Sequence, residues 1–482
     1  MAEKSLKKNA FYSVLKVFLS LVFPLITFPY ASRILLPEGI GKINYANNII
    51  SYFIMIASLG IGGYATREAS KVRNDKKLLT KLFKEIITIN LFCCITAYIL
   101  FFISLSVIPK FDYYKDLLLV CSIKILFSVL GIDWIYTANE DFKYITIRSF
   151  FIQLFSLFYL FIFVKTKNDL IQYAIFGILT SVGCNIFNFF RVGKYIDLRI
   201  KVKLVFKKHF KPIFVFFGIT IVTSIYTMLD TTMLGHFSNN TEIGFYAAST
   251  KLGHMVLSLL TAITGILLPR LTSLINKEDK SSFNELITKS ANVLLLLSVP
   301  MTFGLIILAK PLILLLSGEN YLPAVKAMQV IAPIIIFISF GSLTGVQILP
   351  ALGKERISFY SYICGAITNI TLNSIFIPKF GAMGAAIGTV FAEFIVMFVQ
   401  ILYLRKLLRF SFYGKSLIES LIASLFMIII IYFLLKVINN LIISLILSVL
   451  FGVFIYSVTL YTLKNNYFIF YFNKFFKKGL KK

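Results

Sequence analysis

The chain has 482 residues, of which 58% are hydrophobic and 15% charged, and its formal net charge is +28. Soluble globular proteins carry roughly 45–50% apolar and about 25% charged residues, so this composition excludes an ordinary soluble domain. Long apolar runs such as residues 86–108 can each cross a hydrocarbon core of ~30 Å as a helix. Backbone groups cannot stay unpaired in lipid, and these runs lack the alternation of barrel strands. We therefore predict an all-α integral membrane protein.

About fourteen transmembrane helices are predicted, each long enough to span the bilayer. In chain order they cover residues 12–35, 43–66, 85–108, 116–138, 147–164, 170–190, 212–235, 243–268, 286–309, 323–349, 358–377, 383–404, 417–438 and 441–463. The basic start before the first span resembles a signal peptide, but no small-residue cleavage site follows it. We interpret this start as part of the first transmembrane helix.

Basic residues predict the orientation of these helices. Most of the 49 Lys and Arg residues lie at the N-terminus, in the connections after even-numbered spans and in the C-terminal tail. Cytoplasmic connections carry such an excess, so both termini are predicted to be cytoplasmic. The charge then suits the anionic lipids of the inner leaflet rather than a nucleic acid. The tail, residues 465–482, interleaves Tyr and Phe with Lys and is expected to lie along the membrane surface.

An internal repeat is the strongest sign of function. At a shift of 203 residues, Gly41 falls on Gly244 and Arg67 falls on Arg270. Polar stripes at helical spacing also correspond: Asn44, Asn48, Ser51, Ser58 and Gly62 in the second span, and Ala247, Lys251, His254, Thr261 and Gly265 in the eighth. A second correspondence, at a larger shift, relates residues 139–143 to residues 352–356. The repeat predicts two six-helix lobes around a cavity, which is typical of transporters that work by alternating access.

These lobes are predicted to comprise residues 1–205 and 206–405. Residues 406–482 then hold the thirteenth and fourteenth helices and the basic aromatic tail.

Ionisable side chains inside spans are costly and usually face a cavity or a partner. The candidates for substrate binding are Lys16, Arg33, Asn48, Lys124, Arg148 and Lys251. Cations prevail among them, which indicates an anionic substrate, and phosphate is the commonest anion in a membrane. An arginine can hold two phosphate oxygens at once, whereas a lysine acts as a point charge. The alternative for Arg33, Lys124 and Arg148 is that they reach out to the membrane interface from span ends.

Three further residues are candidates for coupling transport to an ion: Asp230, His254 and Glu393. Asp230 could pair with Lys251, either structurally or as a site that binds H+ or another cation. His254 titrates near neutral pH unless its surroundings prevent it. Arg67 and Arg270, which the repeat relates, are candidates for a cytoplasmic gate.

Motifs of catalysis are missing from the sequence. We find no paired carboxylates in an outer loop, no metal-ligand spacing, no nucleophile motif and no P-loop. We therefore expect neither an enzyme, nor a cofactor, nor a metal. The glycine-rich stretch 381–388 lies between two spans and indicates close helix packing.

Several segments resemble Wzx-type polysaccharide repeat-unit flippases of the multidrug/oligosaccharidyl-lipid/polysaccharide exporter superfamily. They are LPEGIGKINYANNIISYFIMIASLGIGGYATREASK (36–71), LDTTMLGHFSNNTEIGFYAASTKL (229–252), LLPRLTSL (267–274), PLILLLSGENYLPA (311–324) and IPKFGAMGAAIGTVFAE (377–393). Residues at matching positions are Arg33, Gly41, Arg67, Asp230, Gly244, Lys251 and Arg270.

This resemblance implies two lobes that form a V around a cationic central cavity in the bacterial cytoplasmic (inner) membrane. It implies transfer of undecaprenyl-diphosphate-linked oligosaccharide to the outer leaflet, coupled to H+, Na+ or the membrane potential. A polysaccharide polymerase and chain-length proteins would be possible partners. The alternatives are a flippase for lipid II or teichoic precursors, a cation-coupled drug exporter, and a membrane-embedded polymerase or glycosyltransferase.

Overall fold

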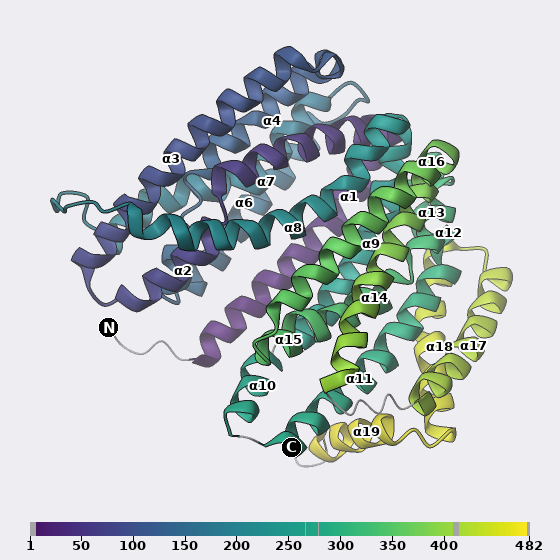
Figure 1. Cartoon of the computed structure of the whole chain (residues 1–482). Coiled ribbons are helices and arrows are strands. Elements are labelled where there is room, and N and C mark those ends of the chain that lie inside the picture. The colour runs from purple at the N-terminus through teal and green to yellow at the C-terminus, as the bar shows by residue number, and fades with distance from the viewer. Residues whose placement is uncertain (1–5, 266, 278, 408–413, 480–482) are drawn as a thin grey trace. The chain divides into compact units, whose positions relative to one another are not determined.

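The computed structural model describes residues 6–265, 267–277, 279–407 and 414–479, and over these residues it is helical, without strands. Contacts divide the chain into two compact units, Met1–Gly235 and His236–Lys482. Each unit is described by itself (Figure 1). Ten helical segments of the described chain are long and apolar enough to cross a membrane. The prediction of an all-α integral membrane protein is thus confirmed.

The first unit is built from eight helices. They are α1 (Leu6–Ser58), α2 (Ile61–Val72), α3 (Lys76–Val107), α4 (Lys115–Ser128), α5 (Asp133–Ala138), α6 (Phe142–Phe163), α7 (Leu170–Arg191) and α8 (Lys207–Phe237). Helix α1 packs against α3, α4 and α6, and α7 packs against both α4 and α6. The middle of this unit is therefore formed by α1, α4 and α7, which carry the polar residues of interest.

A kink divides α1 into the first two predicted spans. Leu36 leaves the helical region at φ 59°, directly before Pro37. A proline disfavours the α conformation of the residue before it, which accounts for the break at this position. Pro24 and Pro29 lie inside the continuous helix, although prolines in a helix interior often bend it. Proline alone therefore does not show where a transmembrane helix will break.

The second unit contains the remaining helices. They are α9 (Asn240–Gly265), α10 (Leu267–Asn276), α11 (Lys280–Ile307), α12 (Ala309–Ser317), α13 (Ala324–Ile331), α14 (Ile334–Gly341), a π-helix (Ser342–Ile348), α15 (Leu349–Ala351), α16 (Glu355–Leu407), α17 (Gly414–Val437), α18 (Leu441–Thr462) and α19 (Asn466–Gly479). The α17–α18 hairpin packs against α11, and α16 packs against α13 and α14.

Helix α16 turns back on itself at Gly381, whose φ is 52°. A Cβ atom on Gly384 would lie 2.2 Å from the Phe376 carbonyl oxygen, and one on Gly388 would lie 2.1 Å from Asn373 Oδ1. Only glycine permits such an approach of the two segments. The interpretation of residues 381–388 as a close-packing stretch is confirmed.

The internal repeat has counterparts within each unit. Asp75 and Asp279 both cap the N-terminus of a long helix, α3 and α11. Glu140 (φ 55°) and Gly353 (φ 68°) both take the left-handed conformation just before α6 and α16. Helix α8 falls in the first contact unit, whereas the repeat makes it the counterpart of α1. The division into lobes at residues 205 and 405 stays a prediction.

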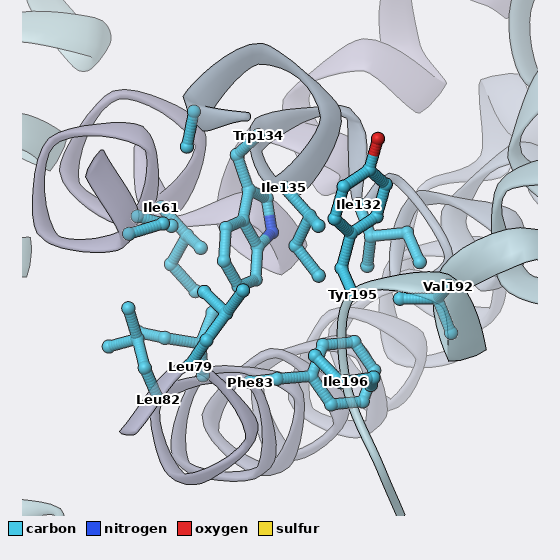
Figure 2. Packing of buried hydrophobic residues seen from close by; sticks show 14 of the residues in the cluster. Ile61, Leu79, Leu82, Phe83, Ile132, Trp134, Ile135, Val192, Tyr195 and Ile196 are labelled. Carbon is cyan, nitrogen blue, oxygen red and sulfur yellow. The ribbon is translucent and has the colours of Figure 1, made fainter. Parts of the chain in front are cut away.

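A hydrophobic core closes one end of the first unit (Figure 2). Ile61 of α2, Phe83 of α3 and Trp134 of α5 meet Tyr195 and Ile196, which follow α7. This core fixes the connection that leads from α7 to α8. On the predicted topology it lies at the cytoplasmic end of the unit.

Candidate functional site

Lys124 lies on α4 in the middle of the first unit, and its side chain is buried, with 9% of the residue exposed. Its ammonium donates a hydrogen bond to Asn47 Oδ1 of α1 at 2.6 Å. On its other side is α7, where a Cβ atom on Gly177 would lie 3.5 Å from Lys124 Nζ. Among the described residues no carboxylate pairs with this lysine. An ammonium has three N–H donors, and Asn47 uses one, so two remain for another acceptor.

Asn48, a predicted binding residue, forms hydrogen bonds to α8 in this structure, and its role in binding stays a prediction. Its amide donates to the Met228 carbonyl at 3.1 Å and to the Thr232 hydroxyl at 2.7 Å, both on α8. Tyr52, one turn further along α1, shares a hydrogen bond with the same Thr232 hydroxyl at 2.9 Å. Asn47 is therefore the residue that sequence reasoning missed, although it stands beside Asn48 in the predicted polar span.

The contact between α1 and α8 is also unusually close. Gly235 of α8 lies so near Tyr45 that an added Cβ atom would come within 2.1 Å of the ring. Lys110 donates a hydrogen bond to the Gly235 carbonyl. Further along α1, Asn48 and Tyr52 also contact α8 through their hydrogen bonds. We call these contacts of α1 and Lys110 with α8 the α1–α8 seam.

Arg148 of α6 is as buried as Lys124, with 6% of the residue exposed, but its Nη1 has partners within the protein. Its Nη1 lies 3.0 Å from Asp133 Oδ1 and also donates to Asn188 Oδ1. Asn188 in turn donates to Asp133. The guanidinium stacks over the Tyr144 ring, 5.5 Å from its centroid. The structure thus gives Arg148 a set of internal partners.

Lys16 and Arg33, the other predicted cations of α1, are both exposed. Lys16 is close enough to Asp133 to interact with it electrostatically, so the structure brings Lys16 and Arg148 to the same carboxylate. Arg33 lies on α1 before the kink at Leu36. A role for either residue in binding stays a prediction.

The remaining predicted residues fall in both units. Asp230 is buried on α8 of the first unit. Lys251 and Glu393 are half-buried and His254 is exposed, on α9 and α16 of the second unit. Their joint role in binding and coupling stays a prediction, as does the pairing of Asp230 with Lys251.

The two predicted gate arginines are both exposed. Arg67 pairs with Glu68 at 3.0 Å and lies 5.7 Å from the centre of the Tyr64 ring. Arg270 of α10 lines a polar pocket that also holds Glu285 and Lys289. A gating role stays a prediction for both arginines.

A second buried polar cluster was not foreseen. Glu85 of α3, fully buried, lies 2.8 Å from His209 Nε2, and His209 Nδ1 lies 2.6 Å from the Tyr64 hydroxyl. Lys208 pairs with the same carboxylate at 2.9 Å, and the Val205 amide donates to it. Both carboxylate oxygens of Glu85 thus have partners. The cluster fastens the start of α8 to α2 and α3.

The comparisons agree with this picture. Residues 6–275, more than half of the chain, match the family described as "Polysaccharide biosynthesis protein", and residues 216–375 match the MatE family. The "Putative O-antigen transporter" of Escherichia coli (strain K12) is 25% identical over 413 residues, which cover 83% of this chain and 97% of that protein. The "Capsular polysaccharide biosynthesis protein CapF" of Staphylococcus aureus is 23% identical over 372 residues, covering 75% and 89%.

Among solved structures, the lipid II flippase MurJ in its inward closed conformation superposes with a TM-score of 0.76 at 18% identity. The superposition covers 93% of this chain and 98% of that one. At this identity the likeness establishes the fold, a transporter fold of the multidrug and polysaccharide exporter type.

Proposed function

Because the chain belongs to the polysaccharide biosynthesis protein family, we propose that it is a flippase for undecaprenyl-diphosphate-linked oligosaccharide repeat units. Like its relatives, the chain is a multi-pass membrane transporter. It is not an enzyme. In the proposed cycle the diphosphate and its sugars cross the bilayer through a polar, cationic path. The polyprenyl tail stays in the lipid.

The observation that carries this proposal is the buried Lys124. A buried charge without a counter-ion costs several kcal/mol, roughly, and proteins keep such groups where a ligand supplies the missing charge. The substrate diphosphate is an anion of the required kind, and Asn47 orients the ammonium toward α7. A Cβ atom on Gly177 would lie in ordinary van der Waals contact with Lys124 Nζ, so the α7 backbone approaches the ammonium closely.

The α1–α8 seam supports alternating access. Helix α8 is held to α1 by Asn48, Tyr52 and Tyr45 at one end, and to α3 by Glu85 at the other. The Glu85 end is buried and charged, so breaking it would be costly. The Thr232 end consists of neutral hydrogen bonds worth about 0.5–1.5 kcal/mol each, which a transport cycle can exchange. We infer that the seam opens while the Glu85 end stays fixed.

Within this proposal, the other predicted residues keep subordinate roles. Lys16, Arg33 and Lys251 would extend the cationic path, and Arg148 would shape it through Asp133. Asp230, His254 and Glu393 would couple transport to H+ or Na+, and Arg67 and Arg270 would gate the cytoplasmic side. The predicted residence in the bacterial inner membrane, with cytoplasmic termini, belongs to the same proposal.

The test is the sidedness of labelled lipid-linked oligosaccharide in spheroplasts of cells depleted of the protein. An impermeant glycosidase should fail to reach the sugar after depletion and should reach it again when the wild-type chain is restored. Lys124→Ala should restore less than about a tenth of the exposure, because one charge-assisted contact is worth about 1.5–3 kcal/mol.

Lys326→Ala is the matched control, since Lys326 lies exposed on α13 and should be dispensable. Full activity of Lys124→Ala at normal expression would show that the cationic-site mechanism is wrong. Unpolymerised units exposed on the outside of depleted cells would instead indicate a polymerase.

A further inference from the structure

The second unit has an apolar groove of about 570 Å³ between α11, α17 and α18. Its walls are mostly aliphatic, with Leu297, Met301, Val449 and Val453 along its length. Gly304 leaves space in the groove, and Gly452 lets α18 approach α17, because a Cβ atom there would lie 3.1 Å from Ile431 and 3.3 Å from Met427. The α17 and α18 surfaces beside it also expose large apolar side chains, as a lipid-facing surface does.

One end of the groove is polar and lies under α19. Tyr467 and Tyr471 of α19 line both the groove and an adjoining pocket of about 350 Å³. That pocket also holds Lys289 of α11, Lys415 and Glu419. A neighbouring pocket of about 470 Å³ shares Lys289 and Tyr471 with it and adds Arg270 and Glu285. Figure 1 shows α19 running across the ends of the other helices of this unit.

The charges at this end have both signs. Three cations, Arg270, Lys289 and Lys415, stand beside two carboxylates, Glu285 and Glu419. Glu419 is buried and is held by a hydrogen bond from Asn465 at 2.6 Å. Lys415 lies 3.8 Å from it and is exposed, so this lysine can turn toward another anion without leaving the pocket.

We propose that this groove and its polar end bind one aminophospholipid of the bilayer, with an acyl chain in the groove and the phosphoethanolamine headgroup beneath α19. The phosphate would lie between Lys289 and Lys415, and Tyr467 and Tyr471 would donate hydrogen bonds to its oxygens. The ammonium would face Glu419 or Glu285. A headgroup with one phosphate and one amine matches a pocket of mixed charge, whereas the carboxylates would repel a diphosphate.

The bound lipid would join elements that are distant in the sequence. Helix α19 contacts α11 and α18, and a lipid beneath it would add contacts to α17 as well. A ligand that binds only the folded state stabilises it, by an amount that grows with the logarithm of the ligand concentration relative to Kd. The site thus acts on the stability of the second unit and does not depend on which substrate the protein transports.

The experiment is native mass spectrometry of the full-length protein, purified in mild detergent from cells rich in phosphatidylethanolamine. Wild-type protein should retain phosphatidylethanolamine, and its apparent Tm should rise when vesicles of this lipid are added back. Gly304→Leu should plug the groove, because a Cβ there has its nearest neighbour, Met427 Cε, at 4.0 Å. Lys289→Gln should remove a phosphate contact, and each variant should retain about fivefold less lipid, equivalent to about 1 kcal/mol.

Lys436→Gln, at the opposite end of α17, is the matched control and should retain lipid as the wild type does. Glu419→Gln keeps the shape of the pocket and should shift the preference from phosphatidylethanolamine toward phosphatidylglycerol. This change of preference can be read even if the Gly304 variant fails to fold. Equal retention by all variants, or a co-purified polyprenyl phosphate in place of the phospholipid, would overturn the proposal.

Discussion

Lys124 and Arg148 are buried to nearly the same degree in the same unit, yet their surroundings differ. Arg148 is surrounded by a carboxylate, an amide and an aromatic ring, all from the protein itself. Lys124 has an amide oxygen and the open backbone of Gly177. The sequence made both residues candidates for substrate binding because both are cations inside a span. The comparison separates two kinds of buried cation, one with a counter-charge from the protein and one without, and we propose that the second kind binds the substrate.

The largest expected effect on stability comes from the paired cation. Arg148→Met leaves the Asp133 carboxylate without its guanidinium and Asn188 Oδ1 without its donor, while the Asn188 amide nitrogen still donates to Asp133. Breaking a buried pair costs about 3–5 kcal/mol, but the Asp133 side chain is 45% exposed, so water screens part of the loss. We expect a loss of about 1–3 kcal/mol, measured as a lower apparent Tm in detergent.

Lys124→Met is the matched variant for this measurement. Replacing a buried charge that has no counter-ion by an apolar side chain of similar length is often neutral or stabilising. Its apparent Tm should therefore stay level or rise, while transport is lost. Equal loss of stability in both variants would show that Lys124 and Arg148 both stabilise the folded protein. The distinction between a paired and an unpaired cation would then be wrong.

The sequence predicted the helices well because hydropathy is a local property. The spans 358–377 and 383–404, for example, are the two arms of α16 on either side of Gly381. The choice between Asn47 and Asn48 could not be predicted, because adjacent residues point about 100° apart and only packing fixes the rotation of a helix. The partners of Arg148 lie far apart along the chain, at positions 133 and 188, so no local pattern reveals them.

The attachment of α8 escaped prediction for the same reason. The repeat relates the turns before α6 and α16, which are local features. Glu85 and His209, however, meet across 124 positions of the sequence. Their contact depends on how the connection after α7 folds against the core of Figure 2. A single sequence contains no signal that predicts such a long-range contact.

A second prediction concerns a variant that gives Lys124 an internal counter-ion, as Arg148 has. Asn47→Asp would place a carboxylate where an amide oxygen now lies 2.6 Å from Lys124 Nζ, giving Lys124 the counter-ion that Arg148 already has. We expect transport to fall by about tenfold, since the substrate phosphate would compete with an internal anion worth about 1.4 kcal/mol. The flippase assay in spheroplasts measures this loss.

Stability provides the control for that variant. The new ion pair should leave the apparent Tm unchanged or raise it, so lost transport cannot be attributed to unfolding. Asn47→Gln, which keeps the amide, should retain more activity than Asn47→Asp at equal expression. The same activity in both variants would mean that the charge beside Lys124 is irrelevant and that Lys124 does not contact an anionic substrate.

The smallest effect is expected for a charged group outside the spans, which is the reference for both buried cations. Asp169 precedes α7 and accepts hydrogen bonds from the Lys165 amide at 2.9 Å and the Thr166 amide at 2.7 Å. These bonds hold the pKa of its carboxyl below the ordinary value. The contribution of Asp169 to stability is therefore complete above the unfolded pKa of about 3.9 and disappears as the pH falls through the lower folded pKa. Asp169→Asn should lower the apparent Tm slightly at pH 7, leave transport unchanged, and lose less stability than the wild type between about pH 4 and pH 3. A large loss at pH 7 would mean that charge in water matters here as much as charge in the membrane, and the contrast drawn between Lys124 and Arg148 would then lose its physical basis.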